Sequence, residues 1–106
     1  MKRNTAQLKE DLIQTGIDEI EKHGIEQLSL RTVAKACGVT HGSPYRHFES
    51  KEGYLKVVLA RLSLFLNQEI NENIDATGSA REQLTQLGLN FIIFAKTYPY
   101  FFEALF

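Results

Sequence analysis

Between Leu28 and Phe48 the sequence gathers side chains that can bind phosphate groups and base edges. This stretch carries three cations, two histidines and no acidic residue. The preceding stretch, from Asn4 to Glu26, carries six acidic residues against two lysines. Phosphate attraction needs local positive charge, so this asymmetry favours a nucleic-acid contact although the whole chain has a formal net charge of only −1. From charge alone, a cluster on a solvated surface is an equally good interpretation.

The same stretch has the pattern of two short helices joined by a turn. Ser29 is placed to cap the first helix, and Gly38 can adopt the positive φ that ends it. Thr40 is predicted to cap a second helix that runs to Phe48. Two helices joined by a turn of this length form a helix-turn-helix, whose second helix enters the DNA major groove. The apolar face of the first helix consists of Leu30, Val33 and Ala34.

The segment VTHGSPYRHFESKEGYL resembles the recognition helix and following segment of TetR/AcrR-family repressors. The family pattern there is roughly Val-Ser/Thr-x-Gly-Thr-Leu-Tyr-x-His-Phe, two residues, then Lys-Glu and an apolar helix. The upstream segment IDEIEKHGIEQLSLRTVAKACGV resembles the family's first two helices, and YPYFFEALF extends the likeness weakly toward the C-terminus. One departure is Pro44, which stands where the family usually has leucine. The resemblance implies a transcriptional regulator, most often a repressor, that binds a double-stranded DNA operator and is not an enzyme.

The motif and the resemblance together predict which residues contact DNA. Arg31 is expected to reach a guanine edge or a phosphate, with a solvated surface arginine as the alternative. The backbone N–H groups next to Ser29 are placed to hold a phosphate. Lys51 resembles the family's phosphate-binding lysine, with a lone surface lysine as the alternative. The complete predicted DNA-binding set is Ser29, Arg31, Thr32, Thr40, His41, Gly42, Ser43, Tyr45, His47 and Lys51.

The start of the second short helix is expected to face the bases, because that end of a recognition helix meets base edges in this motif. Gly42 permits a close approach, and His41 and Ser43 offer hydrogen bonds; for His41 the alternative is an exposed histidine without a role. Tyr45 and His47 match family positions that contact the sugar-phosphate backbone. Their alternatives are a buried ring for Tyr45 and a hydrogen bond within the domain for His47.

Pro44 leaves two interpretations of this helix start. If Thr40 is the cap, Pro44 is the fourth helical residue and removes a backbone hydrogen bond. Thr40 would then also have a phosphate within its reach. If Ser43 is the cap instead, Pro44 opens the helix. His41 and Gly42 then approach DNA from a turn.

Apolar residues at three- and four-residue spacing predict helices along the rest of the chain. Leu8 and the apolar residues after it predict a first helix that ends near His23 and Gly24, and a long fourth helix, capped by Ser50, is expected from about Lys51 to about Ile74. A capping box at Ser79 starts a fifth helix, and a sixth follows at residues 100–106. No stretch alternates with period two, so no sheet is predicted. The stripe expected on the fifth helix is Leu84, Leu87, Gly88, Phe91, Ile92, Ala95 and Tyr98.

We therefore predict an all-α fold in two parts. Residues 1–50 form a three-helix helix-turn-helix DNA-binding domain with its motif at 29–48, and residues 51–106 form a connecting helix and the first helices of a regulatory domain. TetR-like repressors usually continue for several more helices, so the chain resembles a fragment. The resemblance implies a cytoplasmic homodimer in the full-length parent, a palindromic operator and an unidentified small-molecule effector. An unpaired apolar end is expected to drive self-association: Tyr98, Tyr100, Phe101, Phe102, Leu105 and Phe106.

Other classes of function find little support in the sequence. Cys37 has no activating partner and is expected in the core, and a single cysteine excludes an internal disulfide. The spacing of His41 and His47 does not place them on one helix face for a metal, and no glycine-rich phosphate loop or cofactor motif occurs. The polar N-terminus is no signal peptide, and no apolar run approaches the roughly 20 residues that span a bilayer. The alternative function is a helical protein-interaction module that has lost operator binding.

Overall fold

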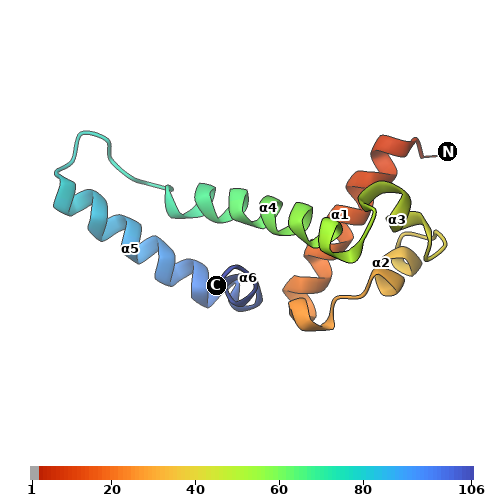
Figure 1. The fold of residues 1–106 in the computed structure, drawn as a ribbon. Coiled ribbons are helices and arrows are strands. Elements are labelled where there is room, and N and C mark those ends of the chain that lie inside the picture. The colour runs from red at the N-terminus through yellow and green to blue at the C-terminus, as the bar shows by residue number, and fades with distance from the viewer. Residues whose placement is uncertain (1–2) are drawn as a thin grey trace.

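Helices alone make up the regular structure of the computed structural model, which describes residues 3–106 (Figure 1). The described part contains no strand, as predicted. The molecule is elongated, measuring 53 × 26 × 23 Å, because a hairpin of two long helices projects from a cluster of shorter ones (Figure 1). The elements are α1 Thr5–His23, the 3-10 turn η1 Ile25–Gln27, α2 Leu30–Ala36, α3 Ser43–Phe48, α4 Lys51–Ile70, α5 Ala80–Thr97 and α6 Pro99–Leu105.

The helix-turn-helix end is built around the contact between α1 and the first half of α4. Leu12 and Ile20 of α1 and Val58 of α4 are completely buried there. Phe48, at the end of α3, packs edge-on against the ring of Tyr54 with the ring centroids 5.1 Å apart. The core of the helix-turn-helix end therefore includes the start of α4, which ties α3 to the long hairpin.

Several boundaries at this end follow the predicted local signals. The first helix ends at Gly24, whose φ of 87° is one that glycine adopts without strain. Ser29 caps α2, because its hydroxyl accepts a hydrogen bond from the Thr32 N–H at 3.3 Å. Gly38 ends the turn after α2 with a φ of 73°, and Ser50 caps α4 through the Gly53 N–H at 3.0 Å. These predictions are confirmed.

The predicted end of the fourth helix is wrong by four residues, because α4 stops at Ile70 and not near Ile74. The side chain of Asn90, on α5, donates hydrogen bonds to the main-chain oxygens of Ile70 at 2.9 Å and Glu72 at 2.7 Å. Asn73 then takes a φ of 59°, which turns the chain out of the helix. A partner on another helix thus satisfies the carbonyl groups that a longer helix would have used.

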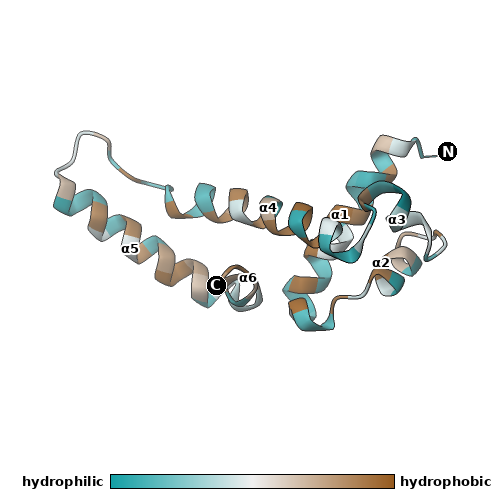
Figure 2. Cartoon of the chain, in the orientation of Figure 1, coloured by the Kyte–Doolittle hydropathy of each residue, from teal (hydrophilic) through white to brown (hydrophobic). Residues whose placement is uncertain are grey.

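The stripe predicted on α5 is partly wrong. Ser79 caps the helix as expected, through the Glu82 N–H at 3.1 Å. The face that packs on α4 is centred on Asn90 and Phe94, whereas Leu84 is 67% exposed and Ile92 54% exposed. Leu87, Phe91, Ala95 and Tyr98 of the predicted stripe are half-buried, and Gly88 is exposed. Figure 2 shows apolar residues along much of α5, so hydropathy alone did not define its buried face.

The final helix runs from Pro99 to Leu105, one residue earlier at each end than the predicted 100–106, and packs against both α1 and α4. Phe101 is only 4% exposed, and its ring stacks on that of Tyr98 with centroids 5.4 Å apart. The expectation that the whole apolar end lacks a partner is therefore wrong, although Tyr100 and Phe106 are still exposed. Within residues 3–106, no helix has the length and apolarity needed to cross a bilayer.

Candidate nucleic-acid interface

The helix that was predicted to contact base edges is short. It starts later in the chain than a cap at Thr40 would place it. The helix α3 begins at Ser43, and no side chain caps it, so the predicted cap role of Thr40 is wrong. Thr40 contributes only its main-chain oxygen, which accepts the Ser43 N–H at 3.0 Å. Pro44 lies in the first turn of α3, where its missing N–H costs no helical hydrogen bond.

This arrangement is close to the second interpretation of Pro44, except that Gly42 and not Ser43 occupies the cap position. His41 and Gly42 consequently lie in the turn before α3 and not in its first helical turn. The ring of Pro44 is fully buried, so packing explains why the chain enters the helix at this point. Ser43 is only 7% exposed, which leaves its hydroxyl little surface for the base contact expected of it.

The remaining predicted positions lie on α2, in the turn before α3, on α3 and at the start of α4, and most of them are exposed. Arg31 and Thr32 on α2, Thr40 and His41 in the turn, and Lys51 at the start of α4 are all exposed. Gly42 and Ser29 are half-buried. Tyr45 is 48% exposed, so its ring is not buried as the alternative of packing would require. His47 is half-buried beside the Phe48 ring.

The exposed cations on these elements have no acidic partner in the part of the chain that the structure describes. No carboxylate of residues 3–106 lies within ion-pairing distance of Arg31, Lys35, Arg46 or Lys51. The arginines that do form ion pairs are elsewhere: Arg3 binds Asp11, and Arg61 binds Glu10. A surface of unpaired cations can exchange its counterions for phosphates, which is the main source of affinity for DNA.

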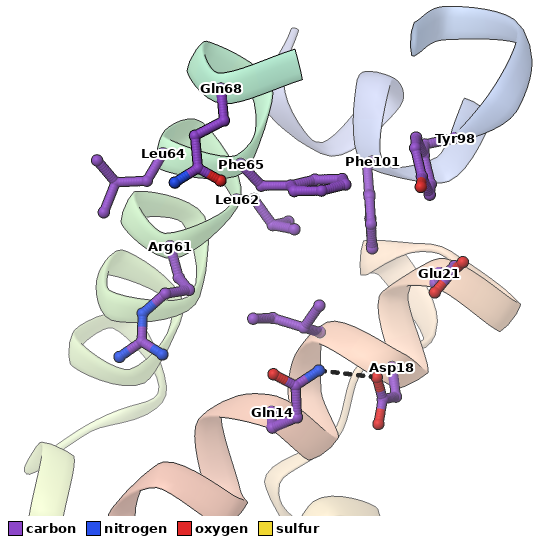
Figure 3. Close-up of a pocket in the computed structure, with 11 residues that line it drawn as sticks. Gln14, Asp18, Glu21, Arg61, Leu62, Leu64, Phe65, Gln68, Tyr98 and Phe101 are labelled. Atoms are coloured by element: carbon purple, nitrogen blue, oxygen red, sulfur yellow. Dashed lines mark hydrogen bonds between the residues drawn. The ribbon is translucent and has the colours of Figure 1, made fainter. Parts of the chain in front are cut away.

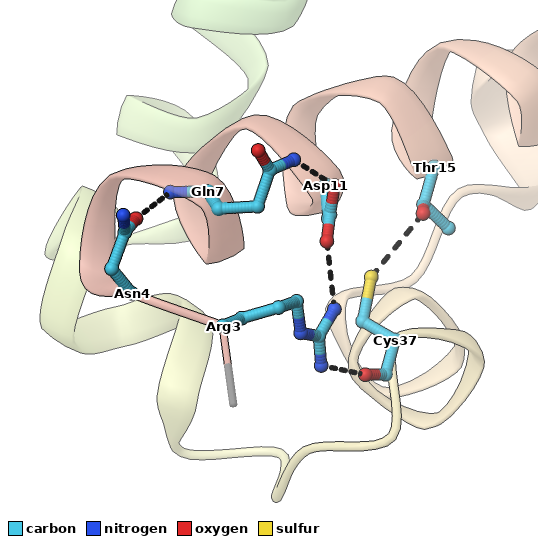
Figure 4. Close-up of polar contacts among 6 residues, drawn as sticks. All are labelled: Arg3, Asn4, Gln7, Asp11, Thr15 and Cys37. Carbon is cyan, nitrogen blue, oxygen red and sulfur yellow. Dashed lines mark hydrogen bonds and ion pairs between the residues drawn. The ribbon is translucent and has the colours of Figure 1, made fainter. Parts of the chain in front are cut away.

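Sequence reasoning missed one residue that shapes this surface. The guanidinium of Arg3 donates to the Asp11 carboxylate at 2.9 Å and to the main-chain oxygen of Cys37, at the end of α2 (Figure 4). The hydroxyl of Thr15 lies 3.2 Å from the Cys37 thiol, which is buried as predicted. These contacts hold the start of the turn between α2 and α3 against α1. They join residues 34 and 22 positions apart, so no local sequence pattern indicates them.

Comparison with known proteins identifies the domain. Residues 12–58 match the family described as bacterial regulatory proteins, tetR family. Residues 12–58 belong to the TetR family. The match runs from the middle of α1 into α4, so it includes the whole helix-turn-helix and the core beneath it. TetR-family proteins are transcriptional regulators and not enzymes, which confirms the prediction of a non-enzymatic chain.

Individual TetR-family relatives agree with this assignment. The chain is 29% identical over 77% of its length to the HTH-type transcriptional repressor KstR2 of Mycolicibacterium smegmatis, of which it covers 40%. It is 36% identical over 47% of its length to the probable acrEF/envCD operon repressor of Escherichia coli, of which it covers 23%. The chain thus spans less than half of either relative.

A solved TetR-family structure supports the fold beyond the matched domain. A TetR-family transcriptional regulator from Haemophilus influenzae superposes with a TM-score of 0.61 at 25% sequence identity. The superposition covers 87% of this chain and 51% of that regulator. The helices after residue 58 therefore also follow a TetR-family arrangement, which confirms the predicted fold class.

Proposed function

We propose that this chain is the DNA-binding part of a transcriptional repressor that recognises a specific operator. The observation that carries the proposal is the surface of unpaired cations on α2, α3 and the start of α4, within a domain of the TetR family. Two relatives described as repressors support the negative sign of regulation.

In this proposal the exposed residues divide into two roles. Arg31, Tyr45 and Lys51 bind phosphates and set the position of the domain on the duplex. His41 and Gly42, in the turn that precedes α3, approach the base edges in the major groove. Thr32, Thr40, His47 and the main chain near Ser29 contact the sugar-phosphate backbone.

The proposal also includes the predicted division into two domains, the homodimer and the response to a ligand. A division at residue 50 separates the helix-turn-helix from α4–α6. Lys51 at the start of α4 still belongs to the proposed DNA-contacting surface, and Tyr54 and Val58 continue the core across the division. A ligand-responsive homodimer on a palindromic operator in the cytoplasm is what the family resemblance implies. The exposed apolar residues of α5, among them Leu84 and Ile92, offer a surface for association.

A binding measurement tests the proposal. Repeated selection from random duplexes would give candidate sequences, and fluorescence anisotropy would compare a selected duplex with a scrambled one of equal length. We expect preference for the selected duplex, and affinity for both that falls steeply as salt rises. No selection above background at low salt would contradict the proposal and favour a protein-interaction module on a TetR-family fold.

A further inference from the structure

A cavity of about 470 Å³ lies between α1, α4 and α6 (Figure 3). Its volume is in the range of small-molecule sites, roughly 300–1,000 Å³. None of the predicted DNA-binding residues lines it. It occupies the junction between the helix-turn-helix end and the long hairpin, so it is a second candidate site, separate from the proposed DNA-contacting surface.

One side of the cavity is an aromatic wall formed by Phe65, Tyr98 and Phe101. Phe65 meets the Tyr98 ring edge-on at 5.1 Å between centroids, and Tyr98 stacks on Phe101. Phe65 and Tyr98 are only half-buried, so part of their ring surface faces the cavity. An apolar ring placed against this wall would remove that surface from water, which favours binding.

The opposite side carries two carboxylates on α1, those of Asp18 and Glu21 (Figure 3). Within residues 3–106, no lysine, arginine or histidine lies within ion-pairing distance of either group. The amide of Gln14 donates to one oxygen of Asp18 at 3.0 Å, and the second oxygen accepts no hydrogen bond from the described residues. The two carboxylates are therefore available to a cation from solution.

The cation of Arg61, which also lines the cavity, does not neutralise this side. Its guanidinium binds both oxygens of Glu10, each at 2.9 Å, in a bidentate pair. This pair keeps the charge of Arg61 beside the Glu10 carboxylate, and Glu10 does not line the cavity. The cavity therefore combines an aromatic wall with a net negative rim.

We propose that this cavity binds an aromatic monocation, with its ring system against Phe65 and Tyr98 and its ammonium group between Asp18 and Glu21. The ring gains from burial and from edge contacts, and the ammonium gains charge-assisted hydrogen bonds. An aromatic anion of the same shape would bring its charge against two carboxylates. An aliphatic ammonium would leave the wall exposed to water. The proposal does not depend on operator binding, because its readout is the binding of the small molecule itself.

Titration calorimetry on the full chain with naphthylethylamine, naphthylacetate and butylamine tests the proposal. We expect saturable binding of naphthylethylamine alone, weakened by added salt. In amide NMR spectra, the largest shifts should fall on α1 near Ile17 and on α4 near Phe65. Equal binding of naphthylacetate or butylamine, shifts centred elsewhere, or no saturable binding would overturn it.

Matched variants test the two carboxylates. Asp18→Asn and Glu21→Gln change exposed side chains and should leave the fold intact. Together they should weaken naphthylethylamine binding by about fivefold, since each exposed charge pair contributes modestly. Glu103→Gln, which removes an exposed acid of α6 that does not line the cavity, should leave the affinity unchanged. An unchanged affinity in the double variant, or an equal loss in Glu103→Gln, would refute the role of the rim.

Discussion

The hydroxyl of Tyr54 occupies the space that a side chain at Gly16 would need. Tyr54 is completely buried, and its hydroxyl donates to the main-chain oxygen of Leu12 at 2.6 Å. A Cβ atom at Gly16 would lie 2.0 Å from the Tyr54 oxygen. The tyrosine of α4 thus rests directly on the backbone of α1, so this pair fixes how closely the two helices approach.

The first prediction follows from this contact. Gly16→Ala should destabilise the chain by about 1–3 kcal/mol, because a fully buried ring has no room to move. This loss would outweigh the roughly 1 kcal/mol that alanine gains over glycine inside a helix. Urea unfolding followed by circular dichroism would measure the difference.

A matched control is available on α5. Gly88 is helical and exposed, and nothing lies within 4 Å of the Cβ position, so Gly88→Ala should stabilise the chain. The double variant Gly16→Ala/Tyr54→Phe should recover part of the loss, since it removes the clashing oxygen. If Gly16→Ala proved as stable as Gly88→Ala, the close approach of the two helices would be wrong.

A second prediction concerns the link between α4 and α5. Asn90→Ala removes two hydrogen bonds to main-chain oxygens from a side chain that is 8% exposed, and should cost about 1–3 kcal/mol. Thr85→Ala, which removes an exposed hydrogen bond within α5, should change little. Equal unfolding midpoints for the two variants would show that Asn90 does not hold the end of α4.

A third prediction tests the phosphate contact of Lys51. Lys51→Ala should weaken binding about equally on all DNA sequences and reduce the salt slope by roughly one unit. Lys96→Ala, an exposed lysine of α5 outside the proposed surface, is the control and should leave the slope unchanged. A normally folded Lys51→Ala protein with the original slope would remove Lys51 from the interface.

A fourth prediction separates base reading from positioning. His41→Ala should change the preference among operator variants, with about 1–3 kcal/mol lost where a good base contact disappears. Ser43→Ala should change that preference much less, because Ser43 is buried at the start of α3. Anisotropy titrations against single-base operator variants would measure both. A uniform loss on every operator would make His41 a positioning residue.

A fifth prediction concerns acid pH. The hydrogen bond from the Arg3 guanidinium, assisted by Gln7, lowers the pKa of the Asp11 carboxyl below its usual value. Asp11 therefore stabilises the fold above its unfolded-state pKa, and this stabilisation is lost as the pH falls through the lower folded-state value. Asp11→Asn should flatten the acid side of a stability–pH curve. In an Arg3→Ala background the same change should have a smaller effect, because only the hydrogen bond from Gln7 then lowers the Asp11 pKa; an equally large flattening there would show that Arg3 is not the main cause of the shift.

The sequence by itself determined the helices and most of their ends, because those signals act within one turn. Ser29, Ser50 and Ser79 each accept an N–H three residues ahead, and Gly24 and Gly38 supply positive φ values where helices end. The helix-turn-helix and its TetR resemblance followed from the same short segments. Such interactions depend on neighbouring residues alone, so they can be predicted before the fold is known.

Only the tertiary structure decided where α3 starts, where α4 stops and which face of α5 is buried. Pro44 lies in the first turn of α3 with its ring fully buried, and the side chain of Asn90 binds the end of α4 at Ile70 and Glu72, which are 20 and 18 residues away. Arg3 reaches Cys37 across 34 residues, and the cavity beside Asp18 exists only because α6 folds back onto α1. These contacts depend on how helices pack in space, and a one-dimensional pattern of apolar residues does not contain that information.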